Sequence, residues 1–393
     1  MFSGQFHNTA LETVLFGQPA AQAVAAAVQA RGARRAFIIA SHSLATTTDE
    51  ISAIERTLGP AHAGTFTGIG AHVPRASVIA AATAARAAAA DLIVAVGGGS
   101  VQDAAKIVPL GLKHGWQRIE DMDGFTIRMS GSGEAIRPAF AGPDVPVIAV
   151  PTTLSGGEYN PLSGATDVRV PVKQPYEHRG MAPVVVVLDT AITRHTPAWL
   201  FLSTGVRAMD HAIETLQSFL SNPVADGAAD TALRLLAEGL PRVHADPHDM
   251  AARLRCQMGA WQSMLPITSG VPMGASHAIG HMLGGTAKVP HGYTSCIITP
   301  HVMRWNASVN AHRQQRIAAA LGDALGDPAG SAADLVANFI AALDLPRTLR
   351  DVGVREDQLP AIAAHARGDI WGRTNPRPMH SADDVLEILR AAF

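Results

Sequence analysis

Short apolar runs alternate with helical stretches through the first half of the chain. The runs are rich in Val and Ile and are bounded by Gly, Pro or Ser, which is typical of parallel strands buried on both faces. They are AFIIA (36–40), LIVAV (92–96), VPVIAV (145–150) and VVVVLD (184–189). Alanine-rich stretches with helical spacing lie between them, at residues 19–33 and 75–90. This alternation predicts an α/β domain with an open parallel sheet and helices on both faces.

After residue 189 the strand signals stop, and apolar positions recur at helical spacing. The helical stretches are residues 197–220, 225–243, 250–265, 313–325 and 332–345. We therefore predict two domains, an α/β domain over residues 1–189 and an all-helical domain over residues 190–393. Residues 121–146 form a long irregular connection, which we interpret as either a hairpin-bearing segment or a plain surface excursion.

Composition and charge narrow the classes of function. Hydrophobic residues make up 47% of the chain and the formal net charge is −2, so no basic field attracts nucleic acid or a membrane surface. We expect no signal peptide, because the N-terminus lacks a basic region followed by an apolar core. The alanine-rich stretch 76–96 is interrupted by Arg86 and Asp91 and is too broken to span a bilayer. Cys256 and Cys296 match no zinc or disulfide spacing, which favours the reducing cytoplasm.

A glycine-rich loop in LIVAVGGGSVQDAAKI (92–107) is the strongest local signal. A predicted strand ends at Val96, Gly97, Gly98 and Gly99 follow, and a helix begins near Ser100. Three glycines let a backbone approach a ligand closely, and the amides of a helix N-terminus favour a pyrophosphate. The alternative is a tight turn without a ligand, for which one glycine would suffice. The spacing is not GxGxxG, so the usual Rossmann fingerprint does not apply.

A second loop, VPTTLSGGEYNP (150–161), also follows a predicted strand. Thr152 and Thr153 are expected at the carboxyl end of the sheet, where open α/β folds bind ligands. Two hydroxyls and two glycines there suit a nucleotide, although a Ser/Thr turn explains the same residues.

Four histidines form the candidate catalytic cluster. His277 and His281 are spaced i and i+4 on a predicted helix that Gly284 and Gly285 end, and His291 follows on a Pro-led loop. His211 lies on an earlier predicted helix. A single histidine on a helix is usually structural, but this set is numerous enough to complete an open zinc site.

Several motifs, taken in order along nearly the whole chain, resemble the iron-containing (group III) alcohol dehydrogenase family. The motifs are GGGSVQDAAK, PTTLSGGE, GVRAMDHAIE, SHAIGHMLGG with PHG, and TPHVMRWN. FTGIGAHVPRASV and the C-terminal NPRPM look most like the maleylacetate reductase branch. The resemblance implies an N-terminal Rossmann-like dinucleotide-binding domain, a helical C-terminal domain and an active site in the cleft between them. This is the dehydroquinate synthase-like architecture.

The resemblance also implies a homodimer and hydride transfer between NAD or NADP and a carbonyl or an activated alkene. The residues that match the family's pyrophosphate loop and its continuation are Gly97, Gly98, Gly99, Ser100, Asp103 and Lys106. Thr152 and Thr153 match the threonines near the nicotinamide. His211, His277 and His291 match the family's three histidine metal ligands, here for zinc or iron. His281 matches the histidine near hydride transfer, a proton relay.

Two departures from the family pattern change the prediction. The family's metal carboxylate falls at Arg207, and maleylacetate reductases also lose that carboxylate and work without metal. A divalent ion about 5 Å from a guanidinium would be repelled by roughly 7 kcal/mol at an effective dielectric constant near 20. We therefore expect no metal, with Arg207 holding a substrate carboxylate or polarising a carbonyl oxygen. The alternative is a structural salt bridge to Asp210 or Glu214. Ser41 stands where NAD-preferring enzymes often carry an acidic residue, so no negative charge at this position repels the 2′-phosphate of NADP.

The leading hypothesis is thus a metal-independent NAD(P)H reductase of a small, carboxylate-bearing organic acid. One alternative is a non-redox lyase or isomerase on the same fold that uses Arg207 and the histidines. Others are a metal-dependent alcohol dehydrogenase with a three-histidine site and a nucleotide-binding protein without catalysis. The intact His281 and glycine loop argue against the last of these.

Overall fold

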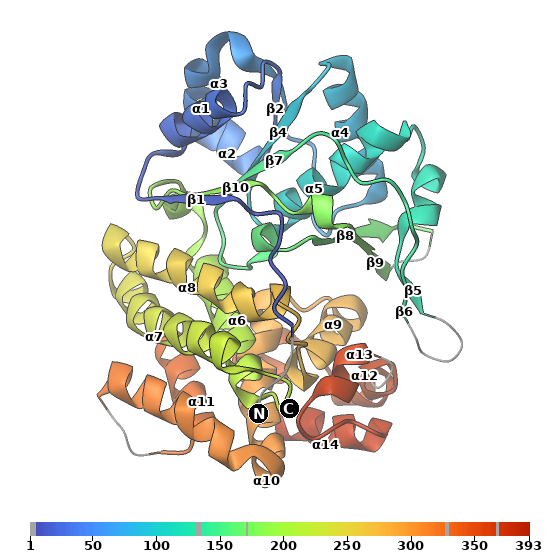
Figure 1. Ribbon diagram of the computed structural model, residues 1–393. Helices are drawn as coiled ribbons and strands as arrows, with labels where there is room; N and C mark the ends of the chain where they lie inside the picture. Colours follow the sequence, from blue (N-terminus) through green and yellow to red (C-terminus); the bar gives the residue numbers. More distant parts are fainter. Residues whose placement is uncertain (1–4, 130–134, 170–171, 327–329, 367–368) are drawn as a thin grey trace. The chain divides into compact units, whose positions relative to one another are not determined.

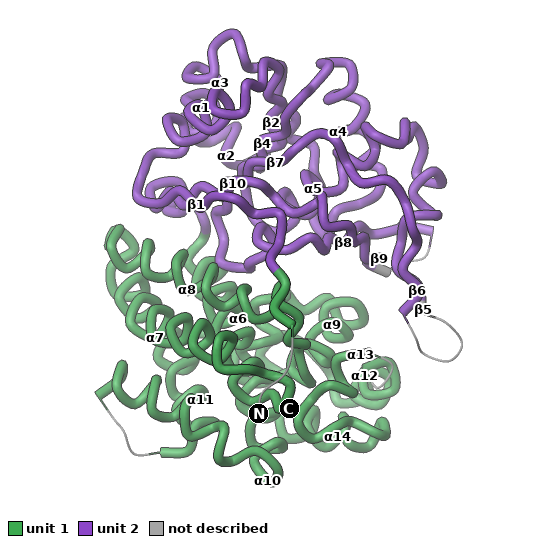
Figure 2. The backbone as a smooth tube through the Cα atoms, in the orientation of Figure 1, with its two compact units in different colours: residues 1–7, 197–393 green, residues 8–196 purple. Residues whose placement is uncertain are grey.

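The computed structural model describes residues 5–129, 135–169, 172–326, 330–366 and 369–393. The chain divides into two compact units, residues 8–196 and residues 1–7 with 197–393 (Figure 2). The strand signal ends at residue 189, but the short 3₁₀ helix Ile192–His195 that follows still belongs to the first unit.

A six-stranded parallel sheet forms the centre of the first unit (Figure 1). In spatial order the strands are β1 (Thr13–Phe16), β10 (Val185–Leu188), β7 (Val147–Pro151), β4 (Leu92–Gly97), β2 (Ala36–Ala40) and β3 (His62–Phe66). The four predicted apolar runs form the four inner strands, which are buried along their whole length. The edge strands β1 and β3 escaped prediction because they are only partly buried and lack a continuous apolar run.

Helices cover both faces of this sheet, as predicted. α1 (Ala20–Ala30) and α3 (Glu50–Leu58) share one core with Ile38 and Val94. α4 (Arg75–Ala87) and α5 (Gly99–His114) share the other core with Ile39 and Ile93. Successive strand residues thus enter opposite cores, as the two-residue period of a strand requires.

Strand order reverses between β2 and β4. From β2 the chain moves outward to β3, then returns to β4 and continues in the other direction to β7 and β10. In open parallel sheets, ligands bind at the carboxyl ends of the strands beside such a reversal. Ser41 and Gly97 stand at these two strand ends.

Two small antiparallel sheets complete the first unit. β5 (Arg128–Met129) pairs with β6 (Ala135–Ile136), so the connection 121–146 does contain a strand pair; residues 130–134 lie outside the described part. β8 (Leu162–Asp167) pairs with β9 (Val172–Glu177).

All regular secondary structure in the described residues of the second unit is helical, which confirms the predicted change of class. Its α-helices are α6 (Ala198–Gln217), α7 (Pro223–Ala245), α8 (Met250–Thr268), α9 (Ala275–Ala287), α10 (His291–Leu325), α11 (Ala332–Ala342), α12 (Leu359–Ala366), α13 (Ile370–Thr374) and α14 (Ala382–Ala391). α6 is buried continuously from Phe201 to Gln217, so its polar residues lie within the protein. No helix in the described ranges is long and apolar enough to cross a membrane.

Two local predictions in this unit were wrong. α9 does not end at Gly284 and Gly285 but continues to Ala287, because a glycine inside a helix costs only about 1 kcal/mol relative to alanine. A Cβ atom on Gly284 would lie 3.2 Å from the ring of His291, so this glycine makes room for that ring. His291 itself is not in a loop but is the first residue of α10, after Pro290.

Candidate active site

The glycine loop joins β4 to the N-terminus of α5, in the order that the sequence predicts. Gly98 precedes the first helical turn, and no side chain caps this end of the 16-residue helix. The free amides and the helix dipole suit a pyrophosphate group, so the loop fits the dinucleotide that the motif implies. Gly97 has a φ of +156°, a region that L side chains rarely adopt.

The glycine loop and the threonine loop lie side by side. β4 pairs with β7, and the amide of Thr152 donates to the carbonyl of Gly97 at 3.1 Å. A Cβ atom on Gly98 would lie 3.1 Å from Cγ2 of Thr153. The glycines are therefore needed for close packing against the threonine loop as well as for ligand approach. Ser41 joins the same edge, because its amide donates to the carbonyl of Val96 at 2.9 Å.

Asp103 and Lys106 face protein partners. The Lys106 ammonium is fully buried and donates to the carbonyl of Gly157 at 2.6 Å, to that of Asn160 at 3.1 Å and to that of Leu162. Burial lowers the pKa of Lys106 to about 8. Asp103 forms an ion pair with Lys173 at 2.7 Å. In this structure both residues hold the segment that follows the threonine loop.

His277 is oriented by carboxylates from α6. Its Nδ1 lies 2.8 Å from Oε2 of Glu214 and 3.4 Å from Oδ2 of Asp210. Glu214 also accepts the amides of Gly274 and Ser276 at 2.8 Å each, and so stabilises the start of α9. With Nδ1 donating to a carboxylate, Nε2 of His277 carries the lone pair, and this atom is buried without a partner among the described residues.

His211 stacks against His277. The ring centroids are 4.9 Å apart, and Nδ1 of His211 lies 3.4 Å from Oγ of Ser263. Burial, and then the positive charge of Arg207, lowers the pKa of His277 to about 3. Burial is also the main cause that lowers the pKa of His211 well below its usual value. Both imidazoles are therefore neutral near pH 7.

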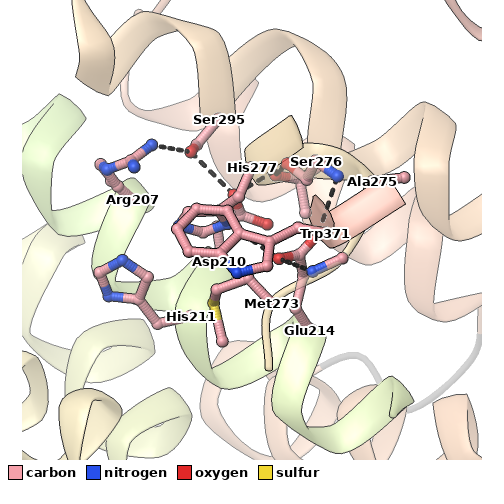
Figure 3. A network of polar contacts seen from close by, with 12 residues as sticks. Arg207, Asp210, His211, Glu214, Met273, Ala275, Ser276, His277, Ser295 and Trp371 are labelled. Carbon is pink, nitrogen blue, oxygen red and sulfur yellow. Dashed lines mark hydrogen bonds and ion pairs between the residues drawn. The ribbon is translucent and has the colours of Figure 1, made fainter. Parts of the chain in front are cut away.

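Arg207 is buried beside these histidines with almost no partner. Only 8% of the residue is exposed, and its one hydrogen bond among the described contacts runs from Nη1 to Oγ of Ser295 at 3.5 Å. Ser295 and Ser276 each donate to Oδ2 of Asp210 at 2.8 Å. Figure 3 shows this line of contacts from Arg207 through Ser295 to Asp210.

The alternative of a direct salt bridge from Arg207 is wrong. Neither Asp210 nor Glu214 lies within 4.0 Å of the guanidinium in the described contacts, because Asp210 is turned toward the two serines and Glu214 toward the start of α9. Burial is the main cause that lowers the pKa of Arg207, and the charges of Asp210 and Glu214 oppose it. Most of the guanidinium's donors are consequently available to a ligand.

The other two histidines form a second pair. The rings of His281 and His291 are 6.0 Å apart, and Nδ1 of His281 lies 3.0 Å from Oδ2 of Asp369. The Trp371 ring lies 4.8 Å from that of His281 and 5.8 Å from that of His277, so it links the two pairs. The sequence pattern did not reveal Asp369 and Trp371, because they lie in a short segment without hydrophobic periodicity. The available signal was an Asp just before a short helical stretch, which is typical of a helix N-cap.

The described residues contain one group of three whose metal-ligating atoms lie within 4.8 Å of one another: Asp210, Glu214 and His277. The predicted set of His211, His277 and His291 is not gathered as closely. In the group of Asp210, Glu214 and His277, Nδ1 of His277 already bonds to Glu214.

Comparison with known proteins identifies the family. Residues 12–190 match the model of the iron-containing alcohol dehydrogenases, and residues 201–393 match that of the C-terminal domain of the same family. The chain belongs to the iron-containing alcohol dehydrogenase family. The predicted family and fold are thereby confirmed, and so is the prediction of an oxidoreductase enzyme.

Individual members of the iron-containing alcohol dehydrogenase family match over nearly the full length. The chain is 34% identical to a dehydrogenase, ALT3, of Alternaria alternata, across 92% of this chain and 99% of that protein. It is 31% identical to a maleylacetate reductase of Sphingobium indicum, across 96% and 94%. The crystal structure of maleylacetate reductase from Agrobacterium tumefaciens superposes with a TM-score of 0.83 at 27% identity and covers 100% of this chain and 99% of that one.

Proposed function

We propose that this protein is a metal-independent NAD(P)H-dependent reductase that acts on the carbonyl or activated alkene of a small organic acid. The observation that supports this proposal is Arg207, a buried guanidinium with unused donors at the position of the family's metal carboxylate. A permanently charged, forked donor suits a carboxylate or a developing oxyanion. The maleylacetate reductases among the relatives fit the same substrate class.

The donor set beside Arg207 does not suit a resident cation. Arg207 is one helical turn from His211, and its charge would oppose a divalent ion by several kcal/mol at about 5 Å. The carboxylates that could offset this charge are engaged: Glu214 with two amides and His277, and Asp210 with two serines. We derive no catalytic step through a metal.

One observation favours the second candidate, a metal-dependent dehydrogenase. His277 donates Nδ1–H to a carboxylate and leaves Nε2 free, which is the usual arrangement around a metal-bound histidine. The same arrangement also serves a neutral histidine that contacts the substrate. Metal analysis of the purified protein separates the two candidates.

In the proposed reaction, a nicotinamide cofactor supplies the hydride when bound. Arg207 holds a substrate carboxylate or the oxygen on which negative charge develops. The neutral His211 and His277 present uncharged faces to the substrate, and His281, which is 31% exposed and reachable by solvent, delivers the proton. We assign the cofactor to the loops of Gly97–Ser100 and Thr152–Thr153.

Cofactor titration tests the first half of this proposal. NADH and NADPH should both bind, with affinities within about tenfold of each other, or about 1.4 kcal/mol, since Ser41 does not repel a 2′-phosphate. Gly98→Val should abolish binding, because its side chain would clash with Thr153. Gly124→Val is the matched control, since a Cβ atom there meets nothing within 4 Å. Failure of both cofactors to bind, or full binding by Gly98→Val, would contradict the assignment.

Turnover measurements test the second half. Cofactor consumption over a panel of keto and enoyl acids should identify substrates, and activity should survive treatment with a chelator. The metal-free mechanism is untenable if the purified protein carries stoichiometric zinc or iron that a chelator removes together with the activity. Absence of cofactor consumption with every acid would favour a non-redox reaction.

We further propose a cytoplasmic homodimer. The free thiols of Cys256 and Cys296 are buried, and burial raises the pKa of both, which suits a reducing compartment without requiring one. Sedimentation or light scattering of the purified chain tests the dimer.

A further inference from the structure

Asp369 contacts the proton-donating histidine and the helix beside it at the same time. Its Oδ2 lies 3.0 Å from Nδ1 of His281, and its Oδ1 accepts the amide of Trp371 at 2.9 Å. Trp371 in turn packs its ring 4.8 Å from the ring of His281. One carboxylate therefore holds both the imidazole and the indole that lies against it.

The environment of Asp369 keeps it ionised. Burial acts to raise the pKa of this carboxyl, but the hydrogen bonds from His281 and from the amide of Trp371 outweigh burial and bring the pKa below its usual value. The side chain of Asp369 is 12% exposed, whereas that of His281 is 31% exposed. The carboxylate thus contacts the imidazole at Nδ1, on its less exposed side. Nε2 of His281 has no hydrogen bond within the described contacts, and it is not one of the fully buried polar atoms that lack a partner.

We propose that Asp369 is the positioning residue of His281. It accepts the Nδ1–H bond, fixes the tautomer and ring orientation, and directs Nε2 toward the substrate. The Nδ1 proton then stays with this carboxylate while Nε2 gives up its proton. This inference rests on the proposed function, in which His281 delivers the proton.

With a carbonyl substrate, the hydride that a bound NAD(P)H would supply forms a C–H bond at the carbonyl carbon, and the π electron pair moves to oxygen. Nε2–H of the His281 imidazolium breaks and an O–H bond forms. The carbonyl is reduced to an alcohol, NAD(P)H is oxidised to NAD(P)⁺, and His281 becomes neutral with its remaining proton on Nδ1, shared with Asp369. Solvent then returns a proton to Nε2.

Asp369→Asn tests this role with little structural change. Asn is as good a helix cap as Asp and can still accept the Trp371 amide. However, Asn removes the negative charge. If its amide nitrogen turns toward Nδ1 of His281, it favours the tautomer that carries its proton on Nε2. We expect kcat to fall roughly 10- to 100-fold, with little change in substrate KM or in the Kd of NADH, since general acid catalysis is worth roughly 10²–10⁴-fold in all. The solvent deuterium isotope effect on kcat should rise as proton transfer becomes slower.

Asp249→Asn is the matched control. Asp249 also caps a helix, by accepting the amide of Ala252 at 2.9 Å, but its other side-chain partner is Arg242 and not a histidine. This variant should keep its kcat and its isotope effect. Asp369→Ser, which retains a capping hydroxyl and removes the carboxylate, provides a second test if Asp369→Asn does not fold.

A double-mutant cycle with His281→Gln decides whether Asp369 acts through the histidine. If it does, adding Asp369→Asn to His281→Gln should change kcat by less than about twofold. Multiplicative effects of the two changes, or full kcat in both folded Asp369 variants, would overturn this inference alone. Full activity of His281→Gln would instead remove His281 from the proposed function, and the inference with it.

Discussion

Replacing Arg207 with Met should remove most of the catalysis and leave a folded protein. Met fills much of the volume of the arginine stem without its charge or its donors. Loss of a charged donor to a reacting or anchoring oxygen costs roughly 2–4 kcal/mol, which is about a 30- to 1000-fold fall in kcat/KM. Arg207→Lys should restore only part of this, because an ammonium cannot reproduce the guanidinium fork.

The cost to stability can be bounded from the line of contacts to Asp210. Ser295 lies 3.5 Å from Nη1 of Arg207 and 2.8 Å from Oδ2 of Asp210. The two charged groups are therefore no more than about 6 Å apart along this line, and they form no ion pair within 4.0 Å, so their attraction lies between about 3 and about 4 kcal/mol at an effective dielectric constant near 20. Asp210 can take up a proton when the guanidinium is gone, since burial already raises its pKa. The loss of unfolding free energy should thus stay at or below about 4 kcal/mol.

The assay pairs steady-state kinetics with urea unfolding, and Arg253→Met is the control. Arg253 is also buried, with its guanidinium 4.6 Å from the Phe201 ring centroid and Nε donating to the carbonyl of Pro247 at 2.7 Å. This control should lose stability and keep its kcat/KM. The reasoning is refuted if folded Arg207→Met retains kcat/KM within about threefold of the wild type, since Arg207 would then be a structural residue only.

Two further predictions concern metal uptake and pH. Arg207→Asp restores a carboxylate beside His211 and should create a protein that takes up zinc or iron, measured by elemental analysis after dialysis; a metal-free variant would show that the histidines cannot be gathered into a site. Burial raises the pKa of Glu158 from 4.5 to about 7. Because the folded state holds this proton more tightly, the stabilising contribution of Glu158 is complete below pH 4.5 and is lost as the pH rises through about 7. Glu158→Gln should therefore flatten the fall in unfolding free energy across this window, and an unchanged slope in urea titrations would count against the assignment.

Hydrophobic pattern alone predicted the parts of the fold that are buried on both sides. The four inner strands of the sheet are continuous apolar runs because helices cover both of their faces, and such runs are visible without any structure. Apolar positions at helical spacing likewise predicted the helical second unit. The pattern did not reveal β1 and β3, because partly exposed strands also accept polar residues. It also placed the end of α9 too early, because Gly284 was interpreted as a helix terminator.

Residue chemistry and family resemblance predicted which side chains to examine, but not what they touch. The sequence by itself determined that a glycine loop follows an inner strand and that its neighbour carries two threonines, whereas only the family resemblance showed that an arginine stands in place of a carboxylate. These are properties of short segments, and local rules of strand, turn and helix suffice for them. The position of Ser41 beside Gly97 required the strand order, since only the sheet decides which strand ends are neighbours.

The partners of the catalytic side chains were decided by tertiary structure alone. Arg207 meets Ser295 across 88 residues of sequence, and His281 meets Asp369 across 88 more. Whether a buried charge finds a carboxylate, a hydroxyl or a free space depends on how helices far apart in the chain pack together, and no periodicity records it. For this reason the sequence could suggest a salt bridge for Arg207, whereas only the packing of α6 against α9 and α10 showed that Asp210 and Glu214 are turned to other partners.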